Sequence, residues 1–163
     1  MNEITKDNFH FFWGGKLSNW YPCHFQVAGV WYNCVEQQMM AKKAIKFKDI
    51  NKYNRIMESK LPSEQKKLGR RVKNFDQDEW SRASRNVVYE GCYAKFSQSE
   101  ELKVHLLDTG DRILVEASPY DCIWGIGLSM DDPKATDPAQ WRGENWLGET
   151  LMKVRAYLIS LSL

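Results

Sequence analysis

Residues 32–47 read YNCVEQQMMAKKAIKF, and the interpretation of the rest of the chain depends on this stretch. It consists mostly of good helix formers, so it predicts a helix from about residue 34 to residue 47. Asn33 stands directly before it and is expected to cap its first turn. Residues 24–28 and 30–32 precede it, and because they flank Gly29 they predict a hairpin of two short strands.

The rest of the chain holds signals for one buried strand, one loop and several helices. Residues 112–117, RILVEA, are apolar and β-branched, which predicts the strand, and Ser118-Pro119 turns out of it. Residues 11–23 are predicted to be a loop. The predicted helices run over 50–59, from Pro62 to about Gly69, from Asp76 to about Phe96, from a cap at Ser99 toward Gly110, and from a cap at Asn145 onward.

The C-terminal third holds an irregular segment and an amphipathic helix. Residues 129–145 contain two prolines and four acidic residues, which indicates a long functional or mobile loop. In the final helix, one apolar stripe is expected to dock on the core. Its members are Leu147, Leu151, Val154, Leu158 and Leu161. Together these elements predict an α+β protein, mostly helical with a small sheet, as a single domain over residues 1–163.

The charge balance limits the classes of function. The 163 residues carry a net charge of +2, which is too mild to indicate non-specific binding of nucleic acid by charge alone. Basic residues do cluster between positions 66 and 73, where they either serve phosphates or form a solvated helix face. Aromatic residues make up 13% and include seven tryptophans, more than a core of this size needs, so some are expected to stack on a ring-bearing ligand.

Cysteine usage and hydropathy predict the compartment. The four cysteines form no CxxC pair and no Cys/His cluster, so we expect neither a metal site nor another cofactor. There is no signal-peptide pattern, and no apolar run approaches the ~20 residues that span a bilayer. We expect a reduced, cytoplasmic protein with no membrane association and no obligate protein partner.

Glu36 and Lys43 are the most informative pair of polar residues. They are seven positions apart, so they lie two turns apart on nearly one helix face. A carboxylate and an ammonium on the apolar side of a helix are costly to bury unless they are paired or used. Spacing alone leaves two interpretations open: a functional pair, or a solvated face of salt bridges, which the neighbouring lysines support.

Three further groups of residues have the composition of a ligand site. Asp121 and Trp124-Gly125 follow the predicted buried strand, where they form either a ligand corner or an ordinary turn. Ser18, Asn19 and Trp20 place two small polar side chains beside an indole, which suits a ribose or base and equally suits a cap and a core tryptophan. Trp80, which opens the long helix, has the same two interpretations.

In this order, these segments resemble the NADAR family, also called YbiA-like. The resemblance covers about residues 9–158 and is nearly free of gaps. Besides Trp80, the stretches that carry it are FFWGGKLSNWYP at 11–22, YNCVEQQMMAKKA at 32–44, LGRRV at 68–72, AKFSQ at 94–98, LLDTGDRILVEASPYDCIWGIGL at 106–128, and WRGENWLGETLMKVRAYL at 141–158.

The resemblance implies an N-glycosidase, that is, a hydrolase acting on a bond between a base or amine and a phosphorylated ribose. By position in the motifs, it assigns catalytic roles to Glu36, Lys43 and Asp121, and the pair on the central helix is then a functional one. The residues expected to bind substrate are Ser18, Asn19, Trp20, Arg70, Trp80, Trp124, Gly125 and Asn145. The resemblance implies no metal and no cofactor.

The substrate class depends on a departure within the central motif. Some members read EHYFQAxK where residues 36–43 read EQQMMAKK, and this version is similar to the branch associated with ADP-ribose. We therefore expect removal of ADP-ribose from guanine in DNA or RNA. The alternatives are hydrolysis of ribosylamino-pyrimidine phosphates of riboflavin synthesis, and a non-catalytic module that binds ADP-ribose or a related nucleotide. A small nucleic-acid-binding protein is disfavoured by the mild net charge.

Overall fold

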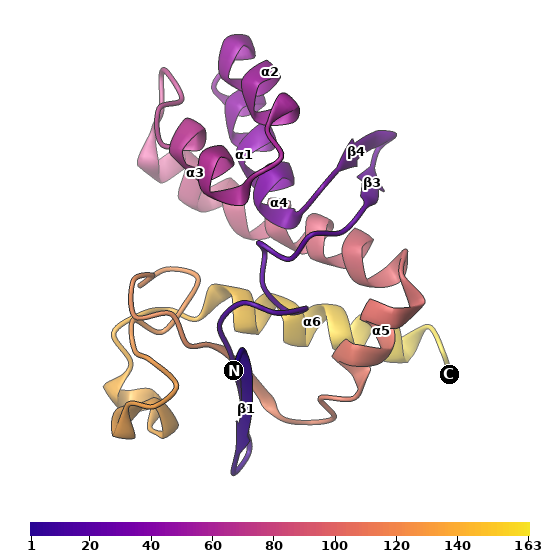
Figure 1. Ribbon diagram of the computed structural model, residues 1–163, viewed down its shortest axis with the longest axis vertical. Coiled ribbons are helices and arrows are strands. Elements are labelled where there is room, and N and C mark those ends of the chain that lie inside the picture. The colour runs from indigo at the N-terminus through magenta and orange to yellow at the C-terminus, as the bar shows by residue number, and fades with distance from the viewer. The chain divides into compact units, whose positions relative to one another are not determined.

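The computed structural model describes residues 1–163 and confirms an α+β fold with six α-helices and two small sheets (Figure 1). Its internal contacts divide the chain into two units. Unit 1 comprises Met1–Ser18 and Ser99–Leu163, and unit 2 comprises Asn19–Gln98. A single domain over the whole chain stays a prediction. None of the helices combines the length and the hydropathy that crossing a membrane requires.

Unit 2 is built around one buried helix, α1 (Val35–Lys46), which packs against three other helices. The hairpin predicted before it is confirmed: β3 (Phe25–Val27) and β4 (Val30–Tyr32) pair antiparallel. Strand β3 also contacts the long helix. The predicted boundaries of the surrounding helices are correct to within about a residue or two: α2 (Ile50–Glu58), α3 (Pro62–Gly69) and α4 (Gln77–Ser97).

The cap of α1 is Cys34, so the prediction of Asn33 as the capping residue is wrong by one position. The Cys34 Sγ accepts a hydrogen bond from the Gln37 amide at 3.4 Å. The Asn33 side chain is engaged elsewhere. Its Nδ2 donates to the Ser59 carbonyl at 3.0 Å, and its Oδ1 accepts from Gln65 Nε2 at 3.0 Å. Asn33 therefore ties the start of α1 to the α2–α3 connection.

Gln37 holds the end of α2 against α1. Its Nε2 lies within hydrogen-bonding distance of three carbonyl oxygens, at 3.1, 3.2 and 3.3 Å, which belong to Ile56, Met57 and Ser59. Its Oε1 accepts from the backbone amide of Asn33 at 2.8 Å. The last carbonyls of a helix have no partner within the helix, so a buried side-chain donor at this point satisfies them.

Two glycines allow neighbouring helices to approach α1 closely. A Cβ at Gly69 of α3 would overlap the Met40 side chain, and one at Gly91 of α4 would overlap the Gln38 side chain. Met40 is therefore a packing residue between α1 and α3. This accounts for an apolar residue at a position where related motifs carry glutamine.

Local capping signals elsewhere are confirmed. Asp76 accepts from the Glu79 amide at 2.8 Å and begins α4, while Ser99 accepts from the Leu102 amide at 3.3 Å and begins α5 (Glu100–Leu107). Gly110 follows the end of α5 with a φ of +61°, a conformation that glycine adopts without strain.

Unit 1 contains a three-stranded sheet, of which only β5 (Ile113–Glu116) was predicted. The order is β1 (Glu3–Lys6), β2 (Phe9–Phe12), β5, with β1 antiparallel and β5 parallel to β2. The prediction of a loop from residue 11 is therefore wrong at its start. Strand β2 lies in the centre of the sheet and reads FHFF, a short run without the apolar–polar alternation that identifies a strand.

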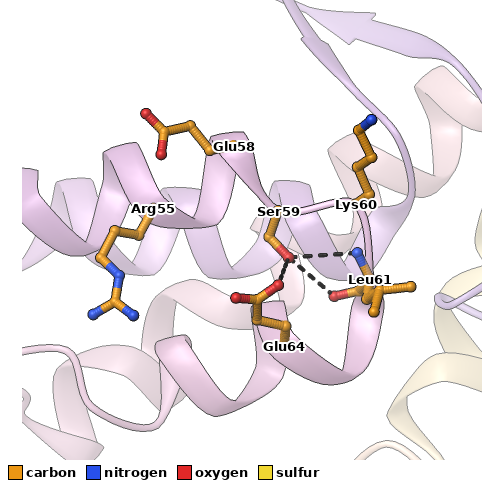
Figure 2. A pocket seen from close by; sticks show the side chains of 6 residues that line it. All are labelled: Arg55, Glu58, Ser59, Lys60, Leu61 and Glu64. Atoms are coloured by element: carbon orange, nitrogen blue, oxygen red, sulfur yellow. Dashed lines mark hydrogen bonds between the residues drawn. The ribbon is translucent and has the colours of Figure 1, made fainter.

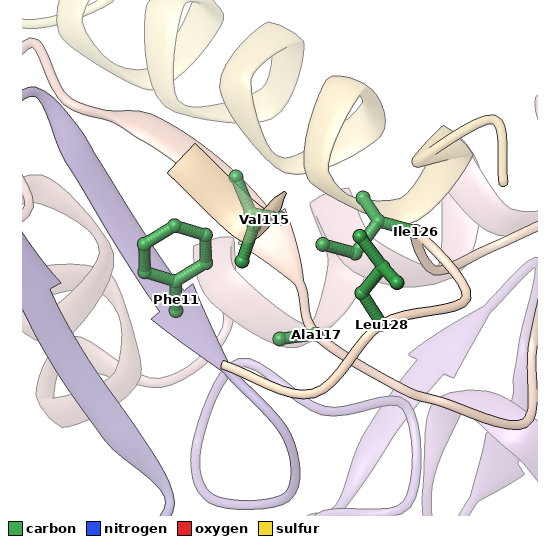
Figure 3. Close-up of a cluster of buried hydrophobic side chains, with 6 residues drawn as sticks. Phe11, Val115, Ala117, Ile126 and Leu128 are labelled. Carbon is green, nitrogen blue, oxygen red and sulfur yellow. The ribbon is translucent and has the colours of Figure 1, made fainter. Parts of the chain in front are cut away.

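The core of unit 1 forms between β2, β5 and the segments that follow β5, as Figure 3 shows. Its buried members are Phe11, Val115, Ala117, Ile126, Leu128 and Ala135. The segment 129–145, predicted to be an irregular loop, is more regular than expected. It contains two short 3-10 helices, η1 (Pro133–Thr136) and η2 (Pro138–Gln140). Trp141 Nε1 closes this segment by donating to the Ala135 carbonyl at 2.8 Å.

Helix α6 (Trp146–Ser160) packs on β5 through the predicted apolar stripe, with one exception. The stripe is buried at Leu147, Leu151, Val154 and Leu158. Leu161 is 58% exposed because the helix ends at Ser160, one residue before it, so its prediction as a core residue is wrong.

We expect Gly148→Ala to destabilise the protein, because the added Cβ would overlap the carbonyl oxygen of Leu114, a backbone atom of β5 that no rotamer change removes. The free energy of unfolding measured in urea should fall by about 3 kcal/mol. Gly69→Ala is the control. Its Cβ overlaps side-chain atoms of Met40, which a rotamer change can move, so the loss should be smaller, about 1 kcal/mol. Equal losses in the two variants would contradict the close packing of α6 on β5.

Candidate functional site

Helix α1 carries a carboxylate and an ammonium on its buried side. Glu36 is 7% exposed and Lys43 is 8% exposed. A solvated face of salt bridges, one of the two interpretations of this spacing, therefore does not describe these side chains. They also interact with each other, because the charge of Glu36 favours the protonated form of Lys43 and so opposes the lowering of the Lys43 pKa by burial. Two ionisable groups placed this way need either partners or a use.

Aromatic rings surround the Lys43 ammonium. Its Nζ lies 4.2 Å from the centroid of the Phe75 ring and 6.0 Å from that of Trp80. The Phe75 ring is itself held by an edge-to-face contact with Phe47, at 5.4 Å between centroids and 71° between planes. A cation over an aromatic face is attracted by the ring quadrupole. The rings therefore hold Nζ in place and favour its charged form.

The pKa of Lys43 is lowered from the ordinary value of lysine. Burial is the main cause, the charge of Glu36 opposes it, and the positive charge of Arg70 adds to it. The folded protein therefore releases this proton at a lower pH than the unfolded chain does. At pH values between the folded and the unfolded pKa of Lys43, the unfolded chain binds more protons than the folded protein. The free energy of unfolding therefore rises with pH in this range.

The start of α1 brings Asn19 to Glu36. The Asn19 carbonyl accepts from the Glu36 backbone amide at 2.9 Å, and Asn19 is buried. Its neighbour Trp20 is 42% exposed, with Lys66 Nζ 5.9 Å from its ring centroid. Of the residues predicted to bind substrate, Asn19, Trp20, Arg70 and Trp80 thus belong to unit 2, with the Glu36/Lys43 pair.

Unit 1 holds the other predicted site residues, and four of them form one cluster after β5. The Asp121 Oδ1 accepts from the amides of Ile123 at 2.9 Å and Trp124 at 2.8 Å, which closes a tight turn. The Trp124 indole packs edge-to-face on Trp146, with centroids 5.7 Å apart. Asp121 is half-buried in this turn, and its contact with substrate stays a prediction.

Gly125 lies at a point of close backbone approach. A Cβ there would come within 2.9 Å of the Glu116 carbonyl oxygen and 3.0 Å of that of Asp121, so only glycine fits. Packing therefore suffices to explain Gly125, and its contact with substrate stays a prediction.

Ser18, the last residue of the N-terminal segment of unit 1, is buried, and its amide donates to the Gly15 carbonyl at 3.0 Å.

Asn145 occupies the predicted N-cap position of α6, but its side chain makes no capping hydrogen bond. Its φ of +52° turns the side chain toward β5. There Nδ2 donates to the Leu114 carbonyl at 2.9 Å, and Oδ1 accepts from the Glu116 amide at 3.0 Å. Asn145 joins α6 to the strand, and its role in substrate binding stays a prediction.

Phe75 is the residue of the site that the sequence analysis missed. It stands directly before Asp76, the cap of α4, and Trp80 is the fourth residue inside that helix. These are the two positions that pack together in a hydrophobic staple at the start of a helix. This signal was present in the sequence and pointed to two rings side by side.

A groove of about 510 Å³ lies elsewhere in unit 2, at the α2–α3 connection (Figure 2). It is lined by Arg55, Glu58, Ser59, Lys60, Leu61 and Glu64, none of which is a predicted site residue. The Ser59 hydroxyl donates to Glu64 at 2.8 Å and accepts from the Leu61 amide at 3.4 Å. Because the groove contains none of the residues that the sequence predicts for the site, we do not place the site there. No group of His, Cys, Asp or Glu side chains is arranged to hold a metal ion.

Comparison with known proteins gives a consistent result. Residues 11–159 match the NADAR domain. The chain is 40% identical over 165 residues to an N-glycosidase of Acanthamoeba polyphaga mimivirus, with 93% of this chain and 97% of that one covered. It is 29% identical to a riboflavin biosynthesis protein of Vibrio vulnificus, matching 88% of this chain and 35% of that protein. The NMR structure of Escherichia coli YbiA superposes with a TM-score of 0.79 at 24% identity, covering 99% and 91% of the two chains.

We expect the Lys43 amine to titrate below the ordinary pH range of lysine, and Phe75→Leu to lower its pKa further, because the substitution removes the ring quadrupole but keeps an apolar side chain. The measurement is ¹³C NMR of lysine ε-carbons, with the Lys43 signal assigned by its loss in Lys43→Met. Phe75→Tyr keeps the ring and should leave the titration nearly unchanged. An identical pKa in wild type and Phe75→Leu would show that the ring does not act on the ammonium.

Proposed function

The chain belongs to the NADAR family, and from this membership we propose that it is an N-glycosidase that hydrolyses the bond between a base and a phosphorylated ribose. The observation that carries the proposal is the burial of both Glu36 and Lys43 on α1. A module that only binds nucleotides would need aromatic and basic side chains, but no buried carboxylate beside a buried amine. The relative named an N-glycosidase supports the same reaction class.

The reaction requires negative charge beside a developing cation. The bond from the anomeric carbon to the base nitrogen breaks, a water oxygen bonds to that carbon, and a proton passes to the leaving nitrogen. The transition state resembles an oxocarbenium ion, so the Glu36 carboxylate can stabilise it and accept a proton from the attacking water. We propose Asp121 as a second carboxylate, which shares this work or orients the ribose hydroxyls.

Lys43 has two chemically distinct roles open to it. As an ammonium over Phe75 and Trp80 it would neutralise a phosphate or polarise the leaving group. As a free amine, the form that burial favours, its Nζ would attack the anomeric carbon of the ring-opened sugar. That second route expels the base and forms an imine, which water hydrolyses to regenerate Lys43.

We propose ADP-ribose on guanine in nucleic acid as the substrate, supported by the EQQMMAKK form of residues 36–43. Arg70 would bind phosphate, while Trp80 and Trp124 would stack on the base or line the ribose. The other residues proposed to contact substrate are Ser18, Asn19, Trp20, Gly125 and Asn145. A ribosylamino-pyrimidine phosphate is the second candidate, supported by the similarity to a riboflavin biosynthesis protein.

We propose a reducing, cytoplasmic location for the protein and no cofactor. The four cysteines support this location, because none of them forms a disulfide. Cys34 and Cys92 are buried, and burial raises the pKa of the Cys34 thiol to about 12, so it stays protonated.

The decisive test is to incubate the protein with ADP-ribosylated guanine DNA and, separately, with the ribosylamino-pyrimidine phosphate, and to measure release of the free base. We expect release from the DNA and a loss of about 10²–10⁴-fold in kcat for Glu36→Gln. Substrate affinity should persist, because the lost charge acts on the transition state. Thermal unfolding checks that Glu36→Gln folds normally. Near wild-type turnover in this variant would make Asp121 the leading carboxylate.

Lys43→Met should separate the two lysine roles, because it keeps the apolar length and removes the amine. If Lys43 forms an imine, turnover should vanish, and borohydride should trap a covalent sugar adduct on the wild-type protein that mass spectrometry locates at Lys43. If Lys43 binds phosphate, KM should rise with a smaller change in kcat, and no adduct should form. Full activity with unchanged KM would exclude both roles.

A further inference from the structure

The small net charge of the chain is the sum of two larger and opposite charges, one on each unit. Unit 2, residues 19–98, carries 15 Lys and Arg against eight Asp and Glu, a formal net charge of +7. Unit 1 carries eight Lys and Arg against 13 Asp and Glu, a formal net charge of −5. The sum of +2 disfavours a polyanionic partner for the chain as a whole. Unit 2 by itself has a positive charge within 80 residues that is typical of a surface that binds phosphates.

Five of these cations are gathered at the end of α3 and in the connection to α4. Lys66 and Arg70 are four residues apart, as are Lys67 and Arg71, and the Arg70 amide continues the helical hydrogen bond to the Lys66 carbonyl at 3.0 Å. Lys66 and Arg70 therefore lie on one face of the last turn of α3 and its cap, while Arg71 stands in the turn that follows the helix. Lys73 follows, held by its backbone amide, which donates to Asp49 at 2.9 Å. We call these five residues the basic segment.

The basic segment is available to a ligand. Lys67, Arg70, Arg71 and Lys73 are exposed and Lys66 is half-buried. None of the five side chains forms an ion pair with a carboxylate. Asp49 is the one carboxylate held next to the segment, at the Lys73 amide, so positive charges outnumber negative ones there. Clustered like charges repel one another, and phosphate groups would relieve this repulsion.

Two exposed aromatic rings lie beside these cations. Trp20 is 42% exposed with Lys66 over its ring, and Phe75 is 41% exposed two residues after Lys73. Arg70 links the segment to the candidate site, because its charge is close enough to lower the pKa of Lys43. Unpaired bases stack on exposed rings while the phosphates follow a basic groove, and this combination is how proteins bind single strands.

We propose that the basic segment, with Trp20 and Phe75, binds the sugar-phosphate chain and unpaired bases of a single-stranded nucleic acid next to the modified nucleotide. This inference rests on the proposed function, to which it adds the surface that holds the polymer. A duplex would offer the phosphates but no free base faces. The proposal therefore also predicts a preference for single strands over duplexes of the same length.

The test measures binding of a fluorescein-labelled, unmodified single-stranded deoxythymidine 12-mer by fluorescence anisotropy at several salt concentrations. The variant Lys67→Glu/Arg71→Glu changes two residues of the basic segment that are not assigned to the catalytic machinery. We expect the dissociation constant to rise at least about tenfold, and the slope of log K against log salt to decrease by about 1.4 for two lost phosphate contacts. Trp20→Leu should weaken binding by about fivefold or more without altering this slope.

The matched control is Lys134→Glu/Lys153→Glu, which makes the same change in formal charge at two exposed lysines of unit 1. It should bind the 12-mer like the wild type. Equal weakening in both double variants would reduce the effect to overall charge and overturn the proposal. Equal binding of a 12-base-pair duplex, or equal competition by poly-glutamate, would overturn it in favour of a general polyanion site.

Turnover separates this proposal from the proposed function. Lys67→Glu/Arg71→Glu should hydrolyse ADP-ribosylated guanosine, a nucleoside substrate without a polynucleotide chain, at the wild-type rate. On the ADP-ribosylated oligonucleotide it should show a raised KM. Hydrolysis of both substrates with unchanged KM in this variant would overturn the surface and leave the function standing. Selective loss of 12-mer binding in a protein that cleaves neither substrate would overturn the function and leave the surface standing.

Discussion

The arrangement of unit 2 follows from the burial of a polar helix. Nine of the twelve residues of α1 are buried, and four of these, Glu36, Gln37, Gln38 and Lys43, carry polar or charged side chains. A buried polar group without a partner is costly, so each of them dictates what packs around it. Gln37 donates hydrogen bonds to the last carbonyls of α2, and Gln38 donates to the Val87 carbonyl of α4 at 2.8 Å. Both neighbouring helices are thereby bonded to α1, the helix that carries the candidate site.

The surroundings of Lys43 in unit 2 change its pKa. Burial lowers its pKa, while the carboxylate of Glu36 and the rings of Phe75 and Trp80 favour its charged form. Burial thus acts against the carboxylate and the rings, which lie on α1, on α4 and in the segment before α4.

Much of the fold was predictable because its signals are local. Asp76 and Ser99 cap the helices that they were expected to cap, and the glycine between β3 and β4 marked a real hairpin. The failures occurred where distant parts of the chain decide the outcome. Strand β2 depends on a partner about 100 residues away, and Asn145 turns toward β5 instead of capping its own helix. In the candidate site, spacing placed Glu36 and Lys43 on one helix face, but not in the interior, because the rings around Lys43 lie more than 30 residues further along the chain.

The opposite charges of the two units also affect how the molecules behave toward one another in solution. A net charge of +2 would ordinarily give weak mutual repulsion, but the charge is divided into +7 on one part of each molecule and −5 on another. At low ionic strength the acidic part of one molecule attracts the basic part of the next, while at physiological salt the Debye length of about 8 Å confines this attraction to near contact. The protein should therefore dissolve better in salt than in dilute buffer, and bind both cation and anion exchangers near neutral pH.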